Sequence, residues 1–468
     1  MQLYQRALFG KKVLVVGLGR SGVAAARLCA ARGAQVTVTD AQPAEKLGAA
    51  LAQLPAAAKQ ELGGHRAEIF LAADIIVLSP GVPPLPEVEA ARKRNATITG
   101  ELELASWFVD APMVAITGTN GKSTTTTLCG AILAANGRPT FVGGNLGVPL
   151  AEAVGTPAAE PGGACVLEVS SFQLETVESF RPQVAVVLNV SPDHLDRHGT
   201  LEAYAATKAR IFAAQTPADF AVINVDDPLV EAMAKGIRSQ CVQISTRRAL
   251  GVGGWVDGDA LCVRLAGGPI EYYPAHLLGL IGRHNLENAL AALVAGRLAG
   301  ALPAEARHAL VAFRALPHRM EMVGELDGVF FYDDSKGTNV GAVVAALDRF
   351  PRPVVLIAGG RDKGGSYEPL AKVMRQVGRG AVVIGEAAPK LREALAPAVP
   401  VETAASMEEA VAQAATMARS GDAVLLSPAC ASFDMFRNYE HRAEVFRAAV
   451  KQIIAHRRVV RGGLPEGR

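Results

Sequence analysis

Residues 115–126 read "AITGTNGKSTTT", and this stretch decides which fold to expect around it. An apolar run at residues 113–116 precedes it, and a run of threonines follows. Gly121–Ser123 match the second half of the phosphate-binding pattern G-x-x-x-x-G-K-[ST]. The pattern places its first glycine at position 116, which is Ile116 in this chain, and the glycine comes two residues later, at Gly118. The loop is therefore two residues shorter than usual. The stretch therefore predicts a strand, a shortened phosphate-binding loop and a helix.

These residue types suit a nucleoside triphosphate. Backbone N–H groups at a helix N-terminus can surround a phosphate, Lys122 can neutralise its oxygens, and the Ser123 hydroxyl can reach Mg²⁺. Glu168 ends the apolar run "ACVLE", and a second run, "VAVVLNV", precedes a polar group: Asp193, His194, Asp196 and His198. A carboxylate and a histidine that end neighbouring strands are candidate ligands of a hard cation. Spacing alone leaves open whether the histidines are only polar loop residues.

The rest of the chain repeats one unit: a β-branched run, a glycine-rich turn and an Ala/Leu-rich helical stretch. "KVLVVGLGRSG" opens one such unit and "PVVLIAGGRDKGG" lies in another. This alternation predicts an α/β protein with parallel sheets, and 468 residues suggest roughly three domains. We expect a Rossmann-like domain at 1–100, a central P-loop domain at 101–315 and a second Rossmann-like domain at 316–468. A long terminal helix is expected from about Phe433, followed by a basic tail.

Composition narrows the class of protein. A net charge of +2 gives no sign of a nucleic-acid partner. We find no signal peptide and no apolar run of membrane-spanning length, so we expect a soluble, cytoplasmic protein. We also expect a monomer. The six cysteines are scattered, which predicts reduced, buried thiols and no zinc site: Cys29, Cys129, Cys165, Cys241, Cys262 and Cys430.

The first glycine-rich turn has two readings. Gly17, Gly19 and Gly22 fit G-x-G-x-x-G after a strand, and Asp40 ends the next strand. This pattern is typical of an NAD site. Any nucleotide diphosphate offers the same pyrophosphate and ribose, however, so the turn alone does not identify a cofactor.

Eight short motifs, in order, carry a resemblance to a known family: "GTNGKST", "EVSSFQLE", "NVSPDHLDRH", "TKARIF", "GRHNLENALAA", "LPHRME", "DDSKGTN" and "LSPACASFDMF". Together they resemble the Mur ligases, the ATP-dependent amide-forming enzymes of bacterial peptidoglycan assembly. The likeness runs from Lys12 to about Phe446. The shortened loop also occurs in folylpolyglutamate synthetases, but those enzymes begin close to the loop, whereas a full domain precedes it here. The "GLGRSG" and "SPACASFDMF" motifs favour the members that add D-glutamate to UDP-N-acetylmuramoyl-L-alanine over those that add alanine, a diamino acid or a dipeptide.

The resemblance implies roles for individual residues. The ATP site would comprise Gly118, Thr119, Asn120, Gly121, Lys122, Ser123, Thr124, Asn288, Arg319 and Asp334. The UDP-substrate would be bound by Gly19, Arg20, Ser21, Asp40, Asn145, Ser170 and Gln173. D-Glutamate would be bound by Lys336, Thr338, Lys363, Ser432 and Tyr439, of which Tyr439 stands where the best-known relative carries phenylalanine. Two Mg²⁺ ions would be held by Ser123, Glu168, His194 and Lys208, with Lys208 as a carbamate formed with CO₂. The catalytic residues would be Lys122, His194, Lys208 and Lys336.

Taken alone, a lysine in a helix, such as Lys208, is a solvated surface charge, and only the resemblance implies otherwise. The UDP-substrate would also replace NAD at the first glycine-rich turn.

Other classes of function stay open from the residues alone. An NAD-dependent oxidoreductase would leave the phosphate-binding loop and "DDSKGTN" without a role. A nucleotide switch that hydrolyses ATP to control a partner would leave the first domain unexplained.

Overall fold

The computed structural model describes residues 8–278, 282–314, 316–348 and 350–462. By contacts the chain divides into two compact units, which we describe separately. The first comprises Met1–Val190, Glu202–Leu278 and Glu287–Phe313, and the second Ser191–Leu201, Gly279–Leu286 and Arg314–Arg468. The predicted boundary at residue 315 falls outside the described residues, and the boundary at residue 100 stays a prediction.

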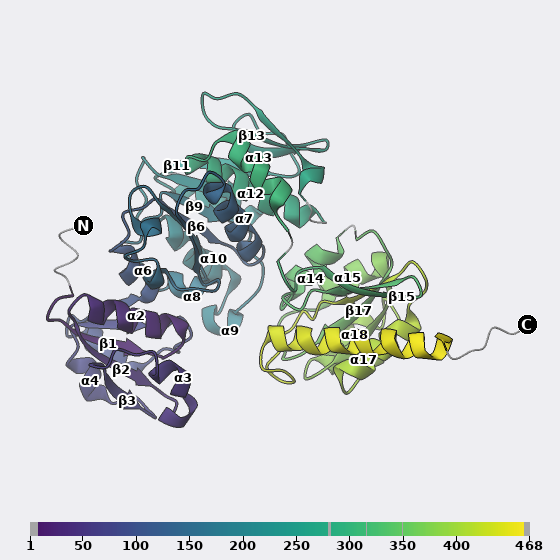
Figure 1. The fold of residues 1–468 in the computed structure, drawn as a ribbon, viewed down its shortest axis with the longest axis horizontal. Helices are drawn as coiled ribbons and strands as arrows, with labels where there is room; N and C mark the ends of the chain where they lie inside the picture. Colours follow the sequence, from purple (N-terminus) through teal and green to yellow (C-terminus); the bar gives the residue numbers. More distant parts are fainter. Residues whose placement is uncertain (1–7, 279–281, 315, 349, 463–468) are drawn as a thin grey trace, which may run out of the picture. The chain divides into compact units, whose positions relative to one another are not determined.

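The first unit begins with a five-stranded parallel sheet in the order β3-β2-β1-β4-β5, of which β1, β2 and β3 are labelled in Figure 1. Its strands are β1 (Lys12–Val16), β2 (Gln35–Asp40), β3 (Lys59–Leu62), β4 (Ile75–Leu78) and β5 (Thr97–Gly100). Its helices are α2 (Arg20–Ala31), α3 (Gly48–Leu51), α4 (Ala67–Leu71), α5 (Pro86–Arg92) and α6 (Glu101–Ser106). The order reverses at β1, and ligands of open α/β sheets bind outside the strand ends at such a point.

A nine-stranded sheet follows, in the order β14-β13-β12-β11-β10-β9-β6-β8-β7. Its strands are β6 (Met113–Thr117), β7 (Thr140–Gly144), β8 (Ala164–Glu168), β9 (Val184–Val187), β10 (Phe220–Asn224), β11 (Gln240–Ser245), β12 (Gly253–Asp257), β13 (Ala260–Arg264) and β14 (Glu271–Pro274). The accompanying helices are α7 (Lys122–Ala134), α8 (Ser171–Leu174), α10 (Leu201–Ala209), α11 (Pro228–Met233), α12 (Arg283–Leu298) and α13 (Pro303–Ala312). The short helix α9 (Leu195–His198) and the first residues of α12 belong to the second unit. Only the β12–β13 and β13–β14 pairings are antiparallel, because short turns join these three strands, and β13 alone runs against the direction of the others.

The second unit holds a six-stranded sheet in the order β15-β16-β20-β17-β18-β19. Its strands are β15 (Glu321–Leu326), β16 (Val329–Asp333), β17 (Val354–Gly359), β18 (Gly378–Ile384), β19 (Val401–Thr403) and β20 (Ala423–Leu426). Its helices are α14 (Val340–Leu347), α15 (Glu368–Val377), α16 (Ala388–Leu395), α17 (Met407–Met417) and α18 (Tyr439–Gly462). Only β15 pairs antiparallel.

Helices cover both faces of this last sheet, which explains its continuous apolar strands. Alternate residues of β17 join two different cores: Val354 and Leu356 pack into one, and Val355 and Ile357 into the other. A parallel strand buried on both faces reads as an unbroken apolar run. The helix α18, drawn in yellow in Figure 1, packs beside α17 and against β15 and β16.

The α/β class with a P-loop sheet and Rossmann-like sheets is confirmed, and two details are corrected. The terminal helix begins at Tyr439 instead of about Phe433, because the Asn438 side chain accepts a hydrogen bond from His441 N at 2.8 Å and so starts the helix there. Cys241 is exposed, unlike the other five cysteines, since it points outward from the half-buried strand β11.

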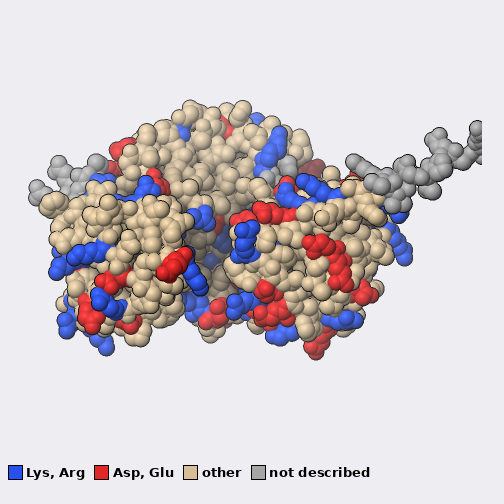
Figure 2. All heavy atoms as spheres, turned by 60° about the horizontal axis from the view of Figure 1, so that its bottom comes forward, with Lys and Arg blue, Asp and Glu red and all other residues tan. Residues whose placement is uncertain are grey.

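Among the described residues, no helix combines the length and apolar character of a membrane span. Figure 2 shows one face of the molecule, on which acidic and basic side chains are interspersed.

Candidate functional site

The phosphate-binding loop joins β6 to α7, as the sequence predicts. Gly121 has φ of 86°, a left-handed conformation that favours glycine, and a Cβ there would lie 2.1 Å from Asn288 Oδ1. Lys122 is the first residue of α7, and its Nζ donates to the carbonyl oxygens of Gly118 at 3.0 Å and Thr119 at 2.9 Å. The lysine therefore lies across the loop that begins its own helix.

Asn189 braces the same loop, and sequence reasoning missed it. Its backbone oxygen accepts from Thr119 N at 2.9 Å, and its Oδ1 accepts from Asn120 N at 2.8 Å. Its Nδ2 donates to Asn120 O at 3.1 Å. Asn189 lies two residues after β9, within the motif "NVSPDH", and β9 pairs with β6, the strand that leads into the loop. The motif was therefore the sequence feature that could have indicated a role for Asn189.

Two predicted residues, Ser123 and Asn145, bond to a third, Glu168, the last residue of β8. Ser123 Oγ donates to Glu168 Oε2 at 2.6 Å, and Asn145 Nδ2 donates to Glu168 Oε1 at 2.7 Å. Glu168 is buried. A buried carboxylate beside a hydroxyl and an amide forms a set of oxygen donors that suits Mg²⁺.

The expectation that Glu168 and the histidine segment end neighbouring strands is wrong in one respect. The strands β8 and β9 both pair with β6, one on each side, and not with each other. The loop strand thus lies between the two strands that precede the candidate ligands.

Lys208 is not on the surface, where a lone helical lysine is expected. It is 1% exposed, its Nζ donates to Gly118 O at 2.9 Å, and it lies 4.4 Å from the centroid of the Tyr204 ring. The lysine from α10 therefore reaches the phosphate-binding loop. Asn288, on α12, lies beside Gly121 of the same loop, and its Oδ1 accepts a hydrogen bond from Thr125 Oγ1 of α7 at 3.4 Å. Thr124, also on α7, is buried.

A pocket of about 430 Å³ opens at the strand ends of the first sheet. Among its lining residues are five predicted for the UDP-substrate: Gly19, Arg20, Ser21, Asp40 and Asn145. Asp40 also shapes the glycine-rich turn, because its Oδ2 accepts from Leu18 N at 2.7 Å. Gly22 lets α2 approach that turn, since a Cβ there would lie 1.9 Å from Gly17 O. His65 lines the pocket too and was not predicted.

Ser170 and Gln173 form a capping box at the start of α8, outside that lining. Gln173 N donates to Ser170 Oγ at 3.3 Å, and Gln173 Oε1 accepts from Ser170 N at 2.9 Å. Their side chains bond each other, which is a sufficient structural reason for both residues.

In the second unit, the predicted amino-acid residues follow three adjacent parallel strands. Lys336 and Thr338 follow β16, Ser432 follows β20, and Lys363 follows β17. The carboxyl ends of parallel strands meet at one edge, so these residues share an edge of the sheet. Lys336 Nζ lies 3.8 Å from the ring centroid of Tyr439, the first residue of α18.

Lys363 carries an ion pair at this edge. Its Nζ lies 3.0 Å from Asp193 Oδ1, and Asp193 Oδ2 accepts from Asn339 Nδ2 at 3.3 Å. A carboxylate therefore already contacts a lysine that is predicted to bind a dicarboxylate. His194 follows directly, at φ of 54°, in the second unit. Its predicted pairing with Lys208, which belongs to the first unit, stays a prediction.

Asp334, predicted for the ATP site, is buried at the same edge. Burial raises the pKa of its carboxyl to about 7, against the lowering effects of the hydrogen bond from Ser427 Oγ at 2.6 Å and of the Arg319 charge. Asp334 and Arg319 therefore interact, as two residues of one site would.

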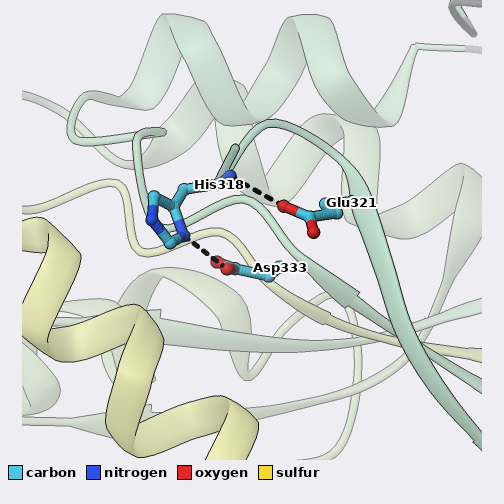
Figure 3. A group of neighbouring side chains, drawn as sticks. All are labelled: His318, Glu321 and Asp333. Atoms are coloured by element: carbon cyan, nitrogen blue, oxygen red, sulfur yellow. Dashed lines mark hydrogen bonds and ion pairs between the residues drawn. The ribbon is translucent and has the colours of Figure 1, made fainter. Parts of the chain in front are cut away.

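One group of metal-ligating residue types lies nearby: His318, Glu321 and Asp333 (Figure 3). His318 Nδ1 lies 2.8 Å from Asp333 Oδ2, and its backbone N donates to Glu321 Oε2 at 3.1 Å. The Arg447 guanidinium donates to both carboxylates, at 2.9 Å to Asp333 and 3.1 Å to Glu321. Because Arg447 supplies the positive charge, we interpret the group as an ion network and not as a metal centre.

Three family models match the chain in succession. They are the Mur ligase MurD-like N-terminal domain at residues 11–100, the Mur ligase middle domain at 116–296, and the Mur ligase glutamate ligase domain at 318–430. Curated relatives match over nearly the whole length. UDP-N-acetylmuramoylalanine--D-glutamate ligase of Geotalea daltonii is 48% identical over 448 residues, 95% of this chain and 98% of the relative. The enzyme of the same name from Anaeromyxobacter dehalogenans is 50% identical over 454 residues, 94% and 97% of the two chains.

Solved structures share the fold. A pseudomurein peptide ligase type C from Methanothermus fervidus has a TM-score of 0.62 at 20% identity, covering 95% of this chain and all of that one. The MurF ligase of Thermotoga maritima in complex with ADP has a TM-score of 0.60 at 18% identity, covering 97% of each chain.

Proposed function

Because the chain belongs to the Mur ligase family, we propose that it joins D-glutamate to UDP-N-acetylmuramoyl-L-alanine through an amide bond, with ATP converted to ADP and phosphate. One observation carries the ATP-dependent part of this proposal: Lys122, Ser123 and Glu168 meet around a phosphate-binding loop. Full-length likeness to relatives named for this reaction supports the choice of substrates.

The reaction needs activation of a carboxylate, which does not react with an amine at neutral pH. In the proposed mechanism the alanyl carboxylate attacks the γ-phosphorus of ATP in line, giving an acyl phosphate and ADP. The deprotonated amine of D-glutamate then attacks the acyl carbon, and phosphate leaves. Lys122, which lies across the loop, would stabilise the negative charge that develops on the transferred phosphoryl group.

The donor set fits Mg²⁺, which would neutralise phosphate charge when bound. Ser123 and Glu168 would hold one ion, and His194 with Lys208 the other. For the second ion, Lys208 would first capture CO₂ as its neutral amine, losing one proton and becoming a carbamate anion. Burial of Lys208 beside the loop, with its Nζ 2.9 Å from Gly118 O, supports a role at the phosphates.

The UDP-substrate would bind at the strand ends of the five-stranded sheet, and D-glutamate at the strand ends of the six-stranded sheet. The pocket at Gly19–Ser21 and Asp40 supports binding of the uridine diphosphate, with Asn145 toward the muramoyl end. Lys336, Thr338, Lys363 and Ser432 offer cations and hydroxyls to a dicarboxylate. The pairing of Lys363 with the Asp193 carboxylate supports this reading, since D-glutamate would offer the same chemical group.

The remaining parts of the proposal concern organisation. We propose three functional domains, at residues 1–100, 101–315 and 316–468, that bind UDP-substrate, ATP and amino acid in that order. We also propose that the protein is cytoplasmic, because ATP and nucleotide-linked precursors are cytoplasmic substrates, and that it is a monomer.

A phosphate-release assay tests the proposal. The enzyme is screened against UDP-N-acetylmuramoyl substrates and amino acids in all pairs, and we expect release only with UDP-N-acetylmuramoyl-L-alanine and D-glutamate together. L-Glutamate should be poor, because inversion at the α-carbon moves the amine or a carboxylate away from its partner. Equal activity with a diamino acid would contradict the choice of substrate. Phosphate release at the same rate with and without amino acids would indicate a nucleotide switch. Micromolar binding of NAD would favour an oxidoreductase.

A further inference from the structure

Arg442, on the first turns of α18, is the largest fully buried side chain of the described residues. Its guanidinium donates three hydrogen bonds: Nε to Ser335 Oγ at 3.0 Å, Nη2 to Ser335 O at 2.9 Å, and Nη1 to Cys430 O at 3.2 Å. All three acceptors are neutral, and no described carboxylate forms an ion pair with this arginine. Burial lowers the pKa of Arg442 to about 10, so the side chain remains charged at neutral pH.

A buried charge of this kind is unfavourable for folding by itself. Removal of a guanidinium from water is compensated only in part by hydrogen bonds, and an apolar side chain of similar volume often serves stability equally well. The arginine therefore needs a reason beyond stability. Its planar fork supplies one, because it can bond two separate backbone segments in fixed geometry, which lysine or methionine cannot do.

The two segments held by Arg442 carry residues of the proposed amino-acid site. Ser335 directly precedes Lys336, and Cys430 lies two residues before Ser432. These segments follow β16 and β20, which are neighbours in the sheet. The Arg442 guanidinium thus connects the segment after β16 to the segment after β20.

A third segment is tied to the same point. Ser335 Oγ, which accepts from Arg442, donates to the backbone oxygen of Tyr439 at 2.8 Å. The Tyr439 ring in turn lies 3.8 Å from Lys336 Nζ. Arg442 and Ser335 together connect the backbone beside Lys336, Ser432 and Tyr439.

We propose that Arg442 is a positioning residue for the amino-acid substrate, which keeps the segments of Lys336, Ser432 and Tyr439 in the arrangement that binds a dicarboxylate. The inference rests on the proposed function. Arg442 itself is fully buried, so it acts through these segments and not by contact with the substrate. D-Glutamate offers two carboxylates and one amine, so its binding depends on the spacing of several donors. A shift of one segment should weaken that binding more than binding of the UDP-substrate, whose proposed residues lie in the first unit.

The test compares Arg442→Met and Arg442→Lys with wild type and with Arg457→Met. Arg457 lies on the same helix, but it is exposed and pairs with Asp327 at 3.0 Å, so it is the matched control. For each variant we would measure KM for D-glutamate, KM for UDP-N-acetylmuramoyl-L-alanine, kcat and the melting temperature. We expect both Arg442 variants to raise KM for D-glutamate at least tenfold and to leave KM for the UDP-substrate within twofold of wild type. Arg457→Met should change neither.

A second variant covers the case in which Arg442→Met does not fold. Ser335→Ala removes the hydroxyl that joins Arg442 to Tyr439 but leaves the bonds of the guanidinium to the two carbonyl oxygens. We expect it to raise KM for D-glutamate several-fold, and less than Arg442→Lys does.

The outcomes separate the inference from the proposed function. Unchanged KM for D-glutamate in folded Arg442 variants overturns the inference. A uniform loss of kcat with a lowered melting temperature and unchanged KM values assigns Arg442 a purely structural role and also overturns it. Absence of any D-glutamate requirement in the wild type is a different result, since it refutes the proposed function itself.

Discussion

Glu101, the first residue of α6, should make the first unit less stable as the pH rises. The carboxyl is 2% exposed, its Oε1 accepts from Ala151 N at 2.7 Å, and its Oε2 has no hydrogen-bond partner among the described residues. Burial raises the pKa of this carboxyl from its ordinary value of 4.5 to about 7, and the charge of Glu152 adds to the effect. Replacement by glutamine keeps the shape and the acceptor for Ala151 N but removes the ionisation.

The direction of this pH dependence follows from the protons that the folded and unfolded states bind. Between pH 4.5 and pH 7 the folded state keeps a proton that the unfolded state has released, so the free energy of unfolding falls as the pH rises through this window. Below the window the protonated carboxyl and the amide are equivalent. Above it the penalty is complete, and a shift of about 2.5 pKa units at about 1.4 kcal/mol each gives a limit of about 3.5 kcal/mol. At about 2 °C per kcal/mol, the melting temperature would differ by about 7 °C at most.

The assay is thermal unfolding of wild type and Glu101→Gln at pH 5, 6.5 and 8. We expect a small advantage for the variant at pH 5, which lies just inside the window, and a growing advantage at pH 6.5 and pH 8. Glu89→Gln is the control, because Glu89 is exposed on α5 and lies 3.6 Å from Arg92 at the surface. An advantage of Glu101→Gln that is the same at every pH, or absent at pH 8, would refute the reasoning.

Three further predictions concern the phosphate-binding loop. Lys122→Ala should lower turnover by about 10²- to 10³-fold, as the loss of a group aimed at developing charge typically does, while calorimetry shows unchanged binding of the UDP-substrate; near-normal turnover would remove the loop from the mechanism. Gly121→Ala should raise KM for ATP at least tenfold, because φ is 86° and the new Cβ would lie 2.1 Å from Asn288 Oδ1; an unchanged KM in steady-state kinetics would mean that the loop does not hold the nucleotide. Lys208→Ala should be nearly inactive, Lys208→Arg should not restore activity, and formate at high concentration should partly rescue the alanine variant by replacing the carboxylate; full activity of Lys208→Ala without formate would exclude the carbamate.

Much of the fold could be predicted because local patterns determine it. Parallel strands buried on both faces leave continuous apolar runs, and the glycine-rich turns that follow them mark the strand-to-helix junctions. The strands β13 and β14 were not predicted, because they are only five and four residues long and no α-helix directly follows either strand, so they fall outside the repeating strand–helix pattern. The start of α18 was misplaced because the capping by Asn438 depends on a single side chain and not on a periodic pattern.

Some residues of the candidate site can likewise be predicted from local sequence patterns, and others cannot. Lys122 and Ser123 can be recognised because a phosphate dictates residue type and spacing within a few positions. Arg442 cannot, because its partners Ser335 and Cys430 lie 107 and 12 residues away in the chain. An arginine on a terminal helix reads as a solvated charge, and only the fold shows that it is buried. Residues that support a site without touching the ligand therefore leave little local signal, and the structure is where they are found.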